Sequence, residues 1–222
     1  MVRTDAPDTS DAGTDRRERR KAERREAILD AAQRLFTVRG LEATTMDDIA
    51  RECDIAKGTL YLSFDSKDDI AFAVLSRALH ELHETLRASV VDGRGTALER
   101  IQRIADAYYA FSVERPGAFR YLFLVPHPDY AGRVTPEVAE ETELLGFASL
   151  ELLVGLLRQG VEEKSLALSD PWSAAVGMWS ALTGVIVIPT RDAPSSLVGV
   201  DHADLVRQMV QALLRGLHPD HA

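Results

Sequence analysis

The stretch TTMDDIARECDIAKGTLYLSFDSK, residues 44–67, decides how the rest of the chain is interpreted. Apolar residues fall at helical spacing on both sides of Asp54, which predicts two short helices joined by a tight turn. The first is expected to begin at Thr44 or Thr45, because a threonine followed three residues later by an aspartate resembles a capping box. The second is expected to cover residues 56–64. Two helices in this arrangement are typical of a helix-turn-helix, whose second helix presents its N-terminal residues to the major groove of DNA.

Hydroxyl groups, a glycine and lysines gather at the expected starts of these helices. A helix N-terminus offers unpaired N–H groups to a phosphate. Glycine weakens a helix, so the presence of Gly58 suggests that the backbone must approach something closely there. The hydroxyl of Tyr61 is a further candidate donor to a phosphate. By pattern alone, an ordinary helical hairpin with capped ends stays open as the alternative. The candidate DNA-contacting residues are Thr44, Thr45, Lys57, Gly58, Thr59, Tyr61, Ser63 and Lys67.

Length and composition limit the class of protein. The chain has 222 residues, of which 45% are hydrophobic and 27% charged, an ordinary globular balance for one large domain or two smaller ones. A single cysteine, Cys53, excludes an internal disulfide framework and a cysteine-based zinc site. The first 20 residues contain no apolar run, and no uncharged apolar stretch of about 18 residues occurs. We therefore expect a soluble cytoplasmic protein without a membrane partner.

The distribution of charge matters more than the net charge of −9. Residues 1–15 carry a net charge of −3, residues 16–67 a net charge of +2, and residues 68–222 a net charge of −8. Seven basic residues lie in the run RRERRKAERR, residues 16–25. An acidic body with a basic head remains compatible with DNA binding, because the local field at the contact surface steers association. The run is interpreted either as an arm on the DNA backbone or as a solvated, partly helical segment.

The remainder of the chain predicts an all-α fold of about nine helices, since no strand-like alternation of useful length occurs. Three domains are expected: a disordered tail at 1–19, the helix-turn-helix domain at 20–66, and a helical body at 67–222. The body is expected to hold the longer helices. The predicted helices outside 44–64 cover about 20–39, 67–90, 96–114, 118–125, 136–160, 171–188 and 202–217.

The run T-T-M-D-D-I-A followed by G-T-L-Y-x-x-F-x-S-K-D-D closely resembles the N-terminal domain of the tetracycline-repressor (TetR) family of bacterial regulators. The resemblance covers about residues 24–75. It implies an all-α homodimer that binds a palindromic DNA operator and is released by a small molecule bound in the C-terminal domain. Three positions depart from the family pattern: Asp54 replaces a glycine at the turn, Ala56 replaces a serine cap, and Ser63 replaces a histidine. Asp54 is expected to preserve the turn, because aspartate tolerates the left-handed conformation.

The resemblance also implies an effector cavity between the body helices and a dimer interface made by the last two helices. Core packing is the alternative role for the aromatic candidates, while Gly177, Ala181 and Gly184 form a strip of small residues that allows close helix approach. The candidate pocket residues are Tyr108, Tyr109, Phe111, Arg120, Phe123, His127, Trp179 and Thr183. The candidate interface residues are Trp172, Val176, Gly177, Ala181, Gly184, Met209 and Leu213.

Residues for enzymatic chemistry are not recognisable by spacing. No Ser-His-Asp set or pair of carboxylates is apparent, and His80, His83 and Glu84 lack a third metal ligand. We therefore expect no catalysis, no metal and no cofactor. The preferred hypothesis is a cytoplasmic homodimeric repressor released from its operator by a small-molecule effector. The alternative is a helical small-molecule carrier or ligand sensor whose DNA-binding head is not functional.

Overall fold

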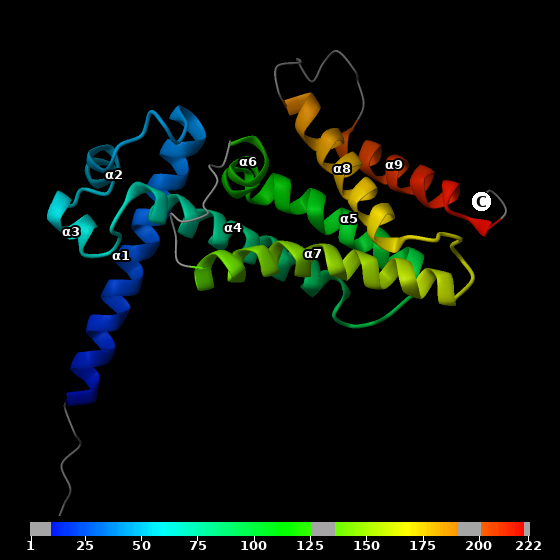
Figure 1. The fold of residues 1–222 in the computed structure, drawn as a ribbon, viewed down its shortest axis with the longest axis horizontal. Helices are drawn as coiled ribbons and strands as arrows, with labels where there is room; N and C mark the ends of the chain where they lie inside the picture. The colour runs from blue at the N-terminus through cyan, green and yellow to red at the C-terminus, as the bar shows by residue number, and fades with distance from the viewer. Residues whose placement is uncertain (1–9, 126–135, 191–200, 220–222) are drawn as a thin grey trace, which may run out of the picture. The chain divides into compact units, whose positions relative to one another are not determined.

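The computed structural model describes residues 10–125, 136–190 and 201–219, and within these ranges the chain is helical and contains no strand (Figure 1). This confirms the all-α prediction, including about nine helices. The helices are α1 (Ser10–Arg39), α2 (Met46–Glu52), α3 (Lys57–Tyr61), α4 (Lys67–Val90), α5 (Ala97–Glu114), α6 (Pro116–Leu124), α7 (Pro136–Glu162), α8 (Pro171–Thr190) and α9 (His202–Gly216).

The chain divides into two compact units, Met1–Val74 and Leu75–Ala222. The division falls inside α4, so the first unit includes the beginning of that helix. Our expected boundary, after residue 66, lies at the N-terminus of α4 instead. The difference arises because Ile70 and Val74, in the first two turns of α4, are fully buried and belong to the first unit.

In the first unit, α2 packs against α1, and α3 packs against α2. Helix α1 contributes the fully buried side chains of Ile28 and Phe36, α2 contributes Ile49, and α3 contributes Leu60. On α1, the buried residues Ile28, Ala32 and Phe36 recur four positions apart, so this helix buries one face. Because α3 is a single five-residue helix with only Leu60 fully buried, its placement depends on this shared core.

The N-terminal half of α1 corrects one expectation. Residues 10–19, which we assigned to a disordered tail, are part of α1, while residues 1–9 lie outside the described residues. The run RRERRKAERR consists mainly of arginine, glutamate, lysine and alanine, all strong helix formers. Acidic and basic residues spaced three or four apart add further support to such a helix. The charged composition of this run, which is typical of a solvated segment, is therefore also compatible with a regular helix.

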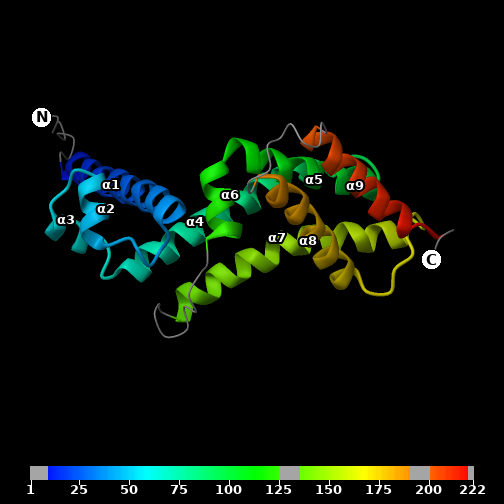
Figure 2. The ribbon, with the colours of Figure 1, turned by 90° about the horizontal axis from the view of Figure 1, so that it is seen from above.

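The second unit is built around α5, which packs against α6, α7, α8 and α9 (Figure 2). Helix α7 also packs against α8, and α8 against α9. The core of the unit is formed by side chains from all of these helices and from the second half of α4. Its fully or nearly fully buried members include Ile101, Tyr108, Phe111, Val154, Leu157, Met178, Leu182, Val206 and Val210.

One helical stretch, Thr142–Glu162 of α7, is long and apolar enough in principle to cross a membrane. Our prediction from the sequence identified no such stretch. This stretch qualifies only by its length and composition, and the core helices of other proteins meet the same two criteria. Val154 and Leu157 of this stretch are fully buried, although only 28% of its apolar window is buried inside the chain.

Candidate nucleic-acid interface

The start of α2 is fixed by a capping box at Thr45. The Asp48 amide donates to Thr45 Oγ1 at 3.2 Å, and the Thr45 amide donates to Asp48 Oδ2 at 3.0 Å. The Thr45 hydroxyl also donates to Asp48 Oδ2 at 2.6 Å. These bonds hold the pKa of Asp48 below its usual value, with smaller contributions from Arg51 and Arg39. Thr45 is exposed, so its hydroxyl lies at the protein surface while it caps the helix.

Thr44 is a correction to the predicted set of DNA contacts. Its side chain is fully buried, and its hydroxyl donates to the Gly40 carbonyl at 2.8 Å. Gly40 follows the end of α1 and has a φ of 85°. Thr44 therefore connects the end of α1 to the start of α2 and has no surface to offer a phosphate.

The turn between α2 and α3 depends on Asp54, which adopts a φ of 53°. This left-handed conformation is the one that a glycine would adopt easily and that aspartate tolerates. The amide of Ile55 donates to the Ala50 carbonyl at 3.0 Å and closes the turn. The expectation that Asp54 preserves the turn is confirmed.

Helix α3 presents an open N-terminus. Ala56 is its N-cap and makes no side-chain capping hydrogen bond, so it leaves backbone N–H groups of the first turn without a side-chain partner. Lys57 and Gly58 are exposed, and a Cβ built on Gly58 would meet no atom within 4 Å. Nothing inside the chain therefore requires glycine at position 58, and the space beside it is free for an external backbone.

Tyr61 extends the same exposed surface, with 44% of its area accessible, and Leu62 beside it is largely exposed. Thr59 and Ser63 are half-buried. A helix-turn-helix with an aromatic hydroxyl and an apolar side chain at its surface has groups for both a phosphate and the apolar edge of a base. Sequence reasoning missed Leu62, because its apolar character suggests core packing.

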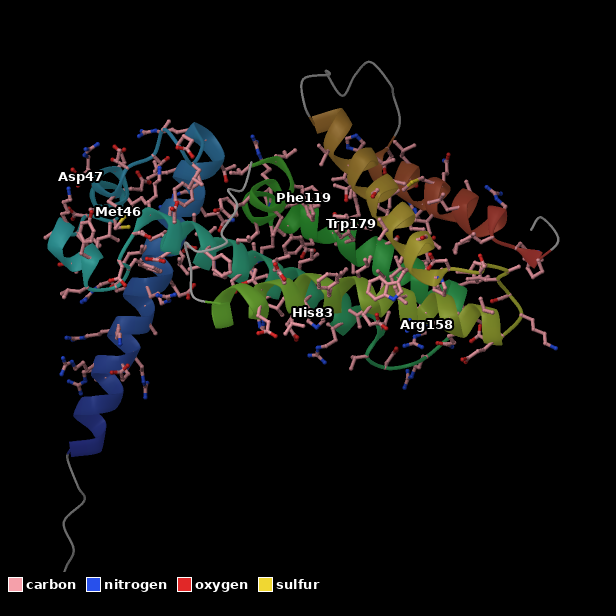
Figure 3. The ribbon with its side chains drawn as sticks, in the orientation of Figure 1. Met46, Asp47, His83, Phe119, Arg158 and Trp179 are labelled. Carbon is pink, nitrogen blue, oxygen red and sulfur yellow. The ribbon has the colours of Figure 1, made fainter. Side chains whose placement is uncertain are left out.

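Lys57 is paired inside the chain. Its Nζ lies 2.7 Å from Asp47 Oδ1, and the hydrogen bond to Asp47 raises the pKa of Lys57. Asp47 belongs to the first turn of α2 (Figure 3). Both side chains are more than half exposed. Lys57 therefore remains accessible, but its charge is partly compensated by Asp47. This ion pair could not be predicted from the sequence, because the two residues are ten positions apart and lie on different helices.

Lys67 serves a different contact. Its Nζ donates to the Leu41 carbonyl at 2.8 Å and so connects the first residue of α4 to the segment after α1. The side chain is half-buried. Six of the eight predicted residues, Thr45, Lys57, Gly58, Thr59, Tyr61 and Ser63, lie at the N-cap of α2, on α3 or just after α3, and their contact with DNA stays a prediction. Lys67 lies at the edge of this group with its amine engaged.

Cys53 closes α2 and touches α1. Its thiol lies 3.7 Å from the Ala27 carbonyl, and burial raises the pKa of the thiol. A raised pKa keeps the group protonated and weakly nucleophilic. The interpretation of Cys53 as an apolar filler fits this geometry.

An aromatic cluster in the second unit contains several of the predicted pocket residues. Tyr108, Phe119 and Phe123 pack with ring centroids 4.8–6.0 Å apart, and Phe123 lies 6.0 Å from Trp179. Figure 3 shows Phe119 and Trp179 on their respective helices, α6 and α8. The Tyr108 hydroxyl lies 2.8 Å from Thr183 Oγ1. Tyr108, Phe123, Trp179 and Thr183 therefore share one site, and Phe119 is a member that sequence reasoning left out.

The other predicted pocket residues are dispersed. Phe111 is buried in the core, Tyr109 packs against that core, and Arg120 is exposed on α6. His127 lies outside the described residues. An open hollow in the described part of the second unit lies elsewhere, between the α7–α8 connection and the end of α9. It is lined by Ala167, Leu168, Ser169, Asp170, Ser173, Ala174 and Leu217.

The surface of α8 carries exposed apolar residues. Val176 and Trp179 are 44% and 39% exposed, and Gly177 between them is also exposed. The other predicted interface residues, Trp172, Ala181, Gly184, Met209 and Leu213, are half-buried in the single chain. An exposed row of large apolar and small residues on one helix is typical of a surface that another helix covers.

Comparison with known proteins identifies both units. Residues 28–74 match the family model "Bacterial regulatory proteins, tetR family", and residues 101–213 match the "Tetracyclin repressor-like, C-terminal domain". The first match covers α2, α3 and the flanking parts of α1 and α4. The second covers most of the helical body, including the aromatic cluster and the exposed row on α8.

Relatives and solved structures agree with these matches. The chain is 32% identical to the transcriptional repressor KstR2 of Rhodococcus jostii over 90% of this chain and 94% of that protein. It is 30% identical to the transcriptional repressor BepR of Brucella suis over 69% of this chain and 72% of that protein. The solved structure of the regulator PfmR from Thermus thermophilus superposes with a TM-score of 0.69 at 26% identity, covering 86% of this chain and 98% of that one. From these matches and from the geometry of α2 and α3, the chain belongs to the tetR family of bacterial regulatory proteins and is a DNA-binding transcriptional regulator.

Proposed function

We propose that this regulator is a homodimeric repressor that binds a palindromic operator through α3 and leaves it when a small molecule binds to the second unit. The exposed N-terminus of α3 carries this proposal. Lys57, Gly58 and Tyr61 lie together at the surface, and Gly58 leaves open space beside the backbone. Repression is favoured over activation because KstR2 and BepR, both at least 30% identical, are named repressors.

A dimer fits the exposed row on α8. Val176 and Trp179 expose apolar area that a second copy of the helix would remove from water, and Gly177 would allow the two helices to approach closely. A two-fold axis would then present two copies of α3 to half-sites about 34–36 Å apart on one side of the duplex. The operator would be palindromic because its symmetry mirrors that of the dimer.

The effector would bind at the aromatic cluster around Tyr108. The rings of Phe119, Phe123 and Trp179 offer apolar contact area, and the Tyr108–Thr183 pair is the polar group among them. Such a lining suits a largely apolar molecule with one hydrogen-bonding group. Trp179 belongs to both the cluster and the exposed part of α8, so a molecule that displaces its ring would alter the surface of that helix. Release from DNA would follow if the effector binds more tightly to the conformation that cannot span both half-sites.

A regulator that binds double-stranded DNA operates where the chromosome lies, so we place it in the cytoplasm. It acts by binding and not by catalysis. Its partners in this proposal are the operator, a second copy of the chain and the effector.

The proposal is tested by selecting bound sequences from a random duplex library with the full chain and measuring affinity for the selected DNA. A palindromic sequence is expected to emerge and to bind far more tightly than an unrelated duplex of equal length. The double variant Lys57→Ala/Tyr61→Ala should lose this binding. The control Arg158→Ala/Val113→Ala, which changes exposed residues of the second unit, should retain it. Equal binding to all duplexes, or no binding at low salt, would contradict the proposal and favour a carrier with an inactive head.

A further inference from the structure

Five of the seven basic residues at positions 16–25 lie on one side of α1. We call these five residues, Arg17, Arg20, Lys21, Arg24 and Arg25, the basic row. They recur at separations of one, three and four residues, so they share one side of α1. All five are exposed. The helix-turn-helix contacts described above use none of them.

The basic row continues the buried face of the same helix. Farther along α1, which packs against α2, Ile28, Ala31 and Leu35 are buried. Stepping backward from Leu35 by four, three, four, three and four residues gives Ala31, Ile28, Arg24, Lys21 and Arg17. Because α1 is one continuous helix, the side that is apolar in its second half is basic in its first half.

Acidic residues occupy the opposite side. Glu23, Glu26 and Asp30 follow one another at separations of three and four residues, on the side of α1 turned away from Ile28 and Ala31. All three are exposed. The separation of charge around the helix is incomplete, because Arg16 and Arg19 fall on the side of Glu23 and Glu26, and Glu18 falls two turns from Arg25 on the basic side. The side that packs against α2 is the more positive one.

A direct contact connects the basic row to the residues after α3. The guanidinium carbon of Arg25 lies 4.3 Å from the centroid of the Phe64 ring, a cation–π distance. Phe64 is buried and lies three residues after the end of α3. The basic row thus begins beside the residues that follow α3. From there α1 continues in the N-terminal direction, past α2 and α3 (Figure 1).

We propose that the first half of α1 is a rigid helical arm whose basic row binds phosphates of duplex DNA flanking the bases read by α3. This inference rests on the proposed function and adds a second contact region to it. Arg17 to Arg25 spans about 12 Å at the rise of an α-helix, a length over which one DNA strand carries roughly three phosphates. DNA phosphate is favoured over an acidic protein as the partner, because Arg25 of the basic row contacts Phe64, just after the helix α3 that is proposed to read the bases.

Contacts of this kind affect affinity without selecting a sequence. Arginine and lysine donate to phosphate oxygens, which are the same at every base pair. The arm should therefore raise affinity for cognate and unrelated duplexes alike. It should also make binding more dependent on salt, because every neutralised phosphate releases a counterion.

The test compares the triple variant Arg17→Gln/Lys21→Gln/Arg24→Gln with wild type in the full chain. A second triple variant, Arg94→Gln/Arg158→Gln/Arg215→Gln, removes the same charge from exposed positions of the second unit and serves as the control. Circular dichroism and thermal unfolding should show that both variants remain folded. Affinity is measured between low and moderate salt on the selected operator, trimmed to its half-sites or extended by about ten base pairs on each side.

On the extended duplex, the arm variant is expected to bind at least tenfold more weakly than wild type at low salt. Its slope of log affinity against log salt should be shallower by roughly 3 for each arm that engages DNA. The ratio of affinities for cognate and unrelated extended duplexes should stay unchanged. On the trimmed duplex, the affinity of wild type should fall close to that of the arm variant.

An arm variant that matches the control in affinity and salt slope would overturn the inference, and the basic row would then serve another partner or none. An equal loss on trimmed and extended duplexes would contradict contact with the flanks. These outcomes differ from failure of the proposed function, in which wild type itself shows no preference for any duplex.

Discussion

The phenol of Tyr108 in α5 donates a hydrogen bond to Thr183 in α8, and a third group fixes this direction. The two oxygens lie 2.8 Å apart. The Thr183 hydroxyl donates its only proton to the Trp179 carbonyl at 2.9 Å, so it is left to accept from Tyr108. Burial raises the pKa of Tyr108 well above its usual value, which keeps the phenol protonated and able to donate. One hydrogen bond thus connects the centre of the second unit to the helix that carries the exposed row.

Removing the two hydroxyls separately should have unequal effects on stability. Thr183→Val leaves the buried Tyr108 hydroxyl without an acceptor, and we expect the free energy of unfolding to fall by about 1–3 kcal/mol. Tyr108→Phe leaves Thr183 bonded to the Trp179 carbonyl, so a loss of about 0.5–1.5 kcal/mol is expected. Urea unfolding of both variants and of the double variant measures the difference. A larger loss for Tyr108→Phe than for Thr183→Val would contradict the assigned direction.

The capping box at Thr45 should matter for both folding and DNA binding. Thr45→Ala removes the acceptor of the Asp48 amide, and an N-cap of this kind contributes about 1 kcal/mol to stability. Because α2 has seven residues, loss of its cap should also weaken operator binding by loosening the support of α3. Thr45→Ser is the control, since serine retains the acceptor. Unfolding and affinity measurements that show no difference between alanine and serine would exclude this role.

Asp48 should make the first unit sensitive to acid. Its pKa is lowered in the folded chain, so the ionised carboxylate stabilises the fold above the ordinary pKa of 3.8. This contribution is lost as the pH falls through the lower pKa of the folded state. We therefore expect Asp48→Asn to be less stable than wild type near neutral pH and the difference to shrink below about pH 4. A difference in unfolding free energy that stays constant from pH 7 to pH 3 would be inconsistent with the lowered pKa.

Features set by neighbouring residues in the chain could be predicted from the sequence. Thr45, Ser66 and Thr96 each precede an acidic residue by three positions, and each caps the helix expected there. Asp54 adopts the left-handed conformation that the turn requires. These outcomes follow from short-range geometry, which a sequence pattern contains. The all-α fold is predictable for the same reason, because helical periodicity is local.

Features that depend on contacts between distant residues were not predictable. Thr44 and Thr45 look equivalent as caps, and only the path of α1 shows that Thr44 is buried against Gly40. Lys67 appears free in the sequence, yet its amine reaches the Leu41 carbonyl, 26 residues away. The pocket candidates stay a prediction, because the spacing of an aromatic residue on a helix face is the same whether the residue fills the core or borders a binding site. The structure groups Phe119 with Tyr108 although no spacing marks them as partners.

The ion pair between Asp47 and Lys57 should restrain DNA binding. Lys57 must share its charge between Asp47 and any phosphate, and Asp47 itself repels the duplex. Asp47→Asn is therefore expected to raise affinity at low salt by roughly threefold or more, with little effect on unfolding because both side chains are largely exposed. Glu52→Gln is the matched control, since it removes an equal charge from the other end of α2, where Glu52 lies 3.4 Å from Arg34. An equal gain in both variants would indicate net charge as the cause, and a loss of affinity for Asp47→Asn would show that Asp47 positions Lys57 productively.

Two exposed helical glycines provide a test of the dimer interface. Gly177 in α8 and Gly155 in α7 are both exposed, and a Cβ built on either would meet no atom within 4 Å of its own chain. Replacing either with leucine should leave the fold intact, because leucine is a better helix former than glycine. If a second copy packs on α8 at the exposed residues Val176 and Gly177, then Gly177→Leu fills space that the partner helix needs. Gly177→Leu should therefore sediment as a monomer and lose most of its operator affinity, whereas Gly155→Leu should behave like wild type. Dimers of unchanged stability in both variants would place the interface elsewhere, and a monomeric Gly155→Leu would assign it to α7.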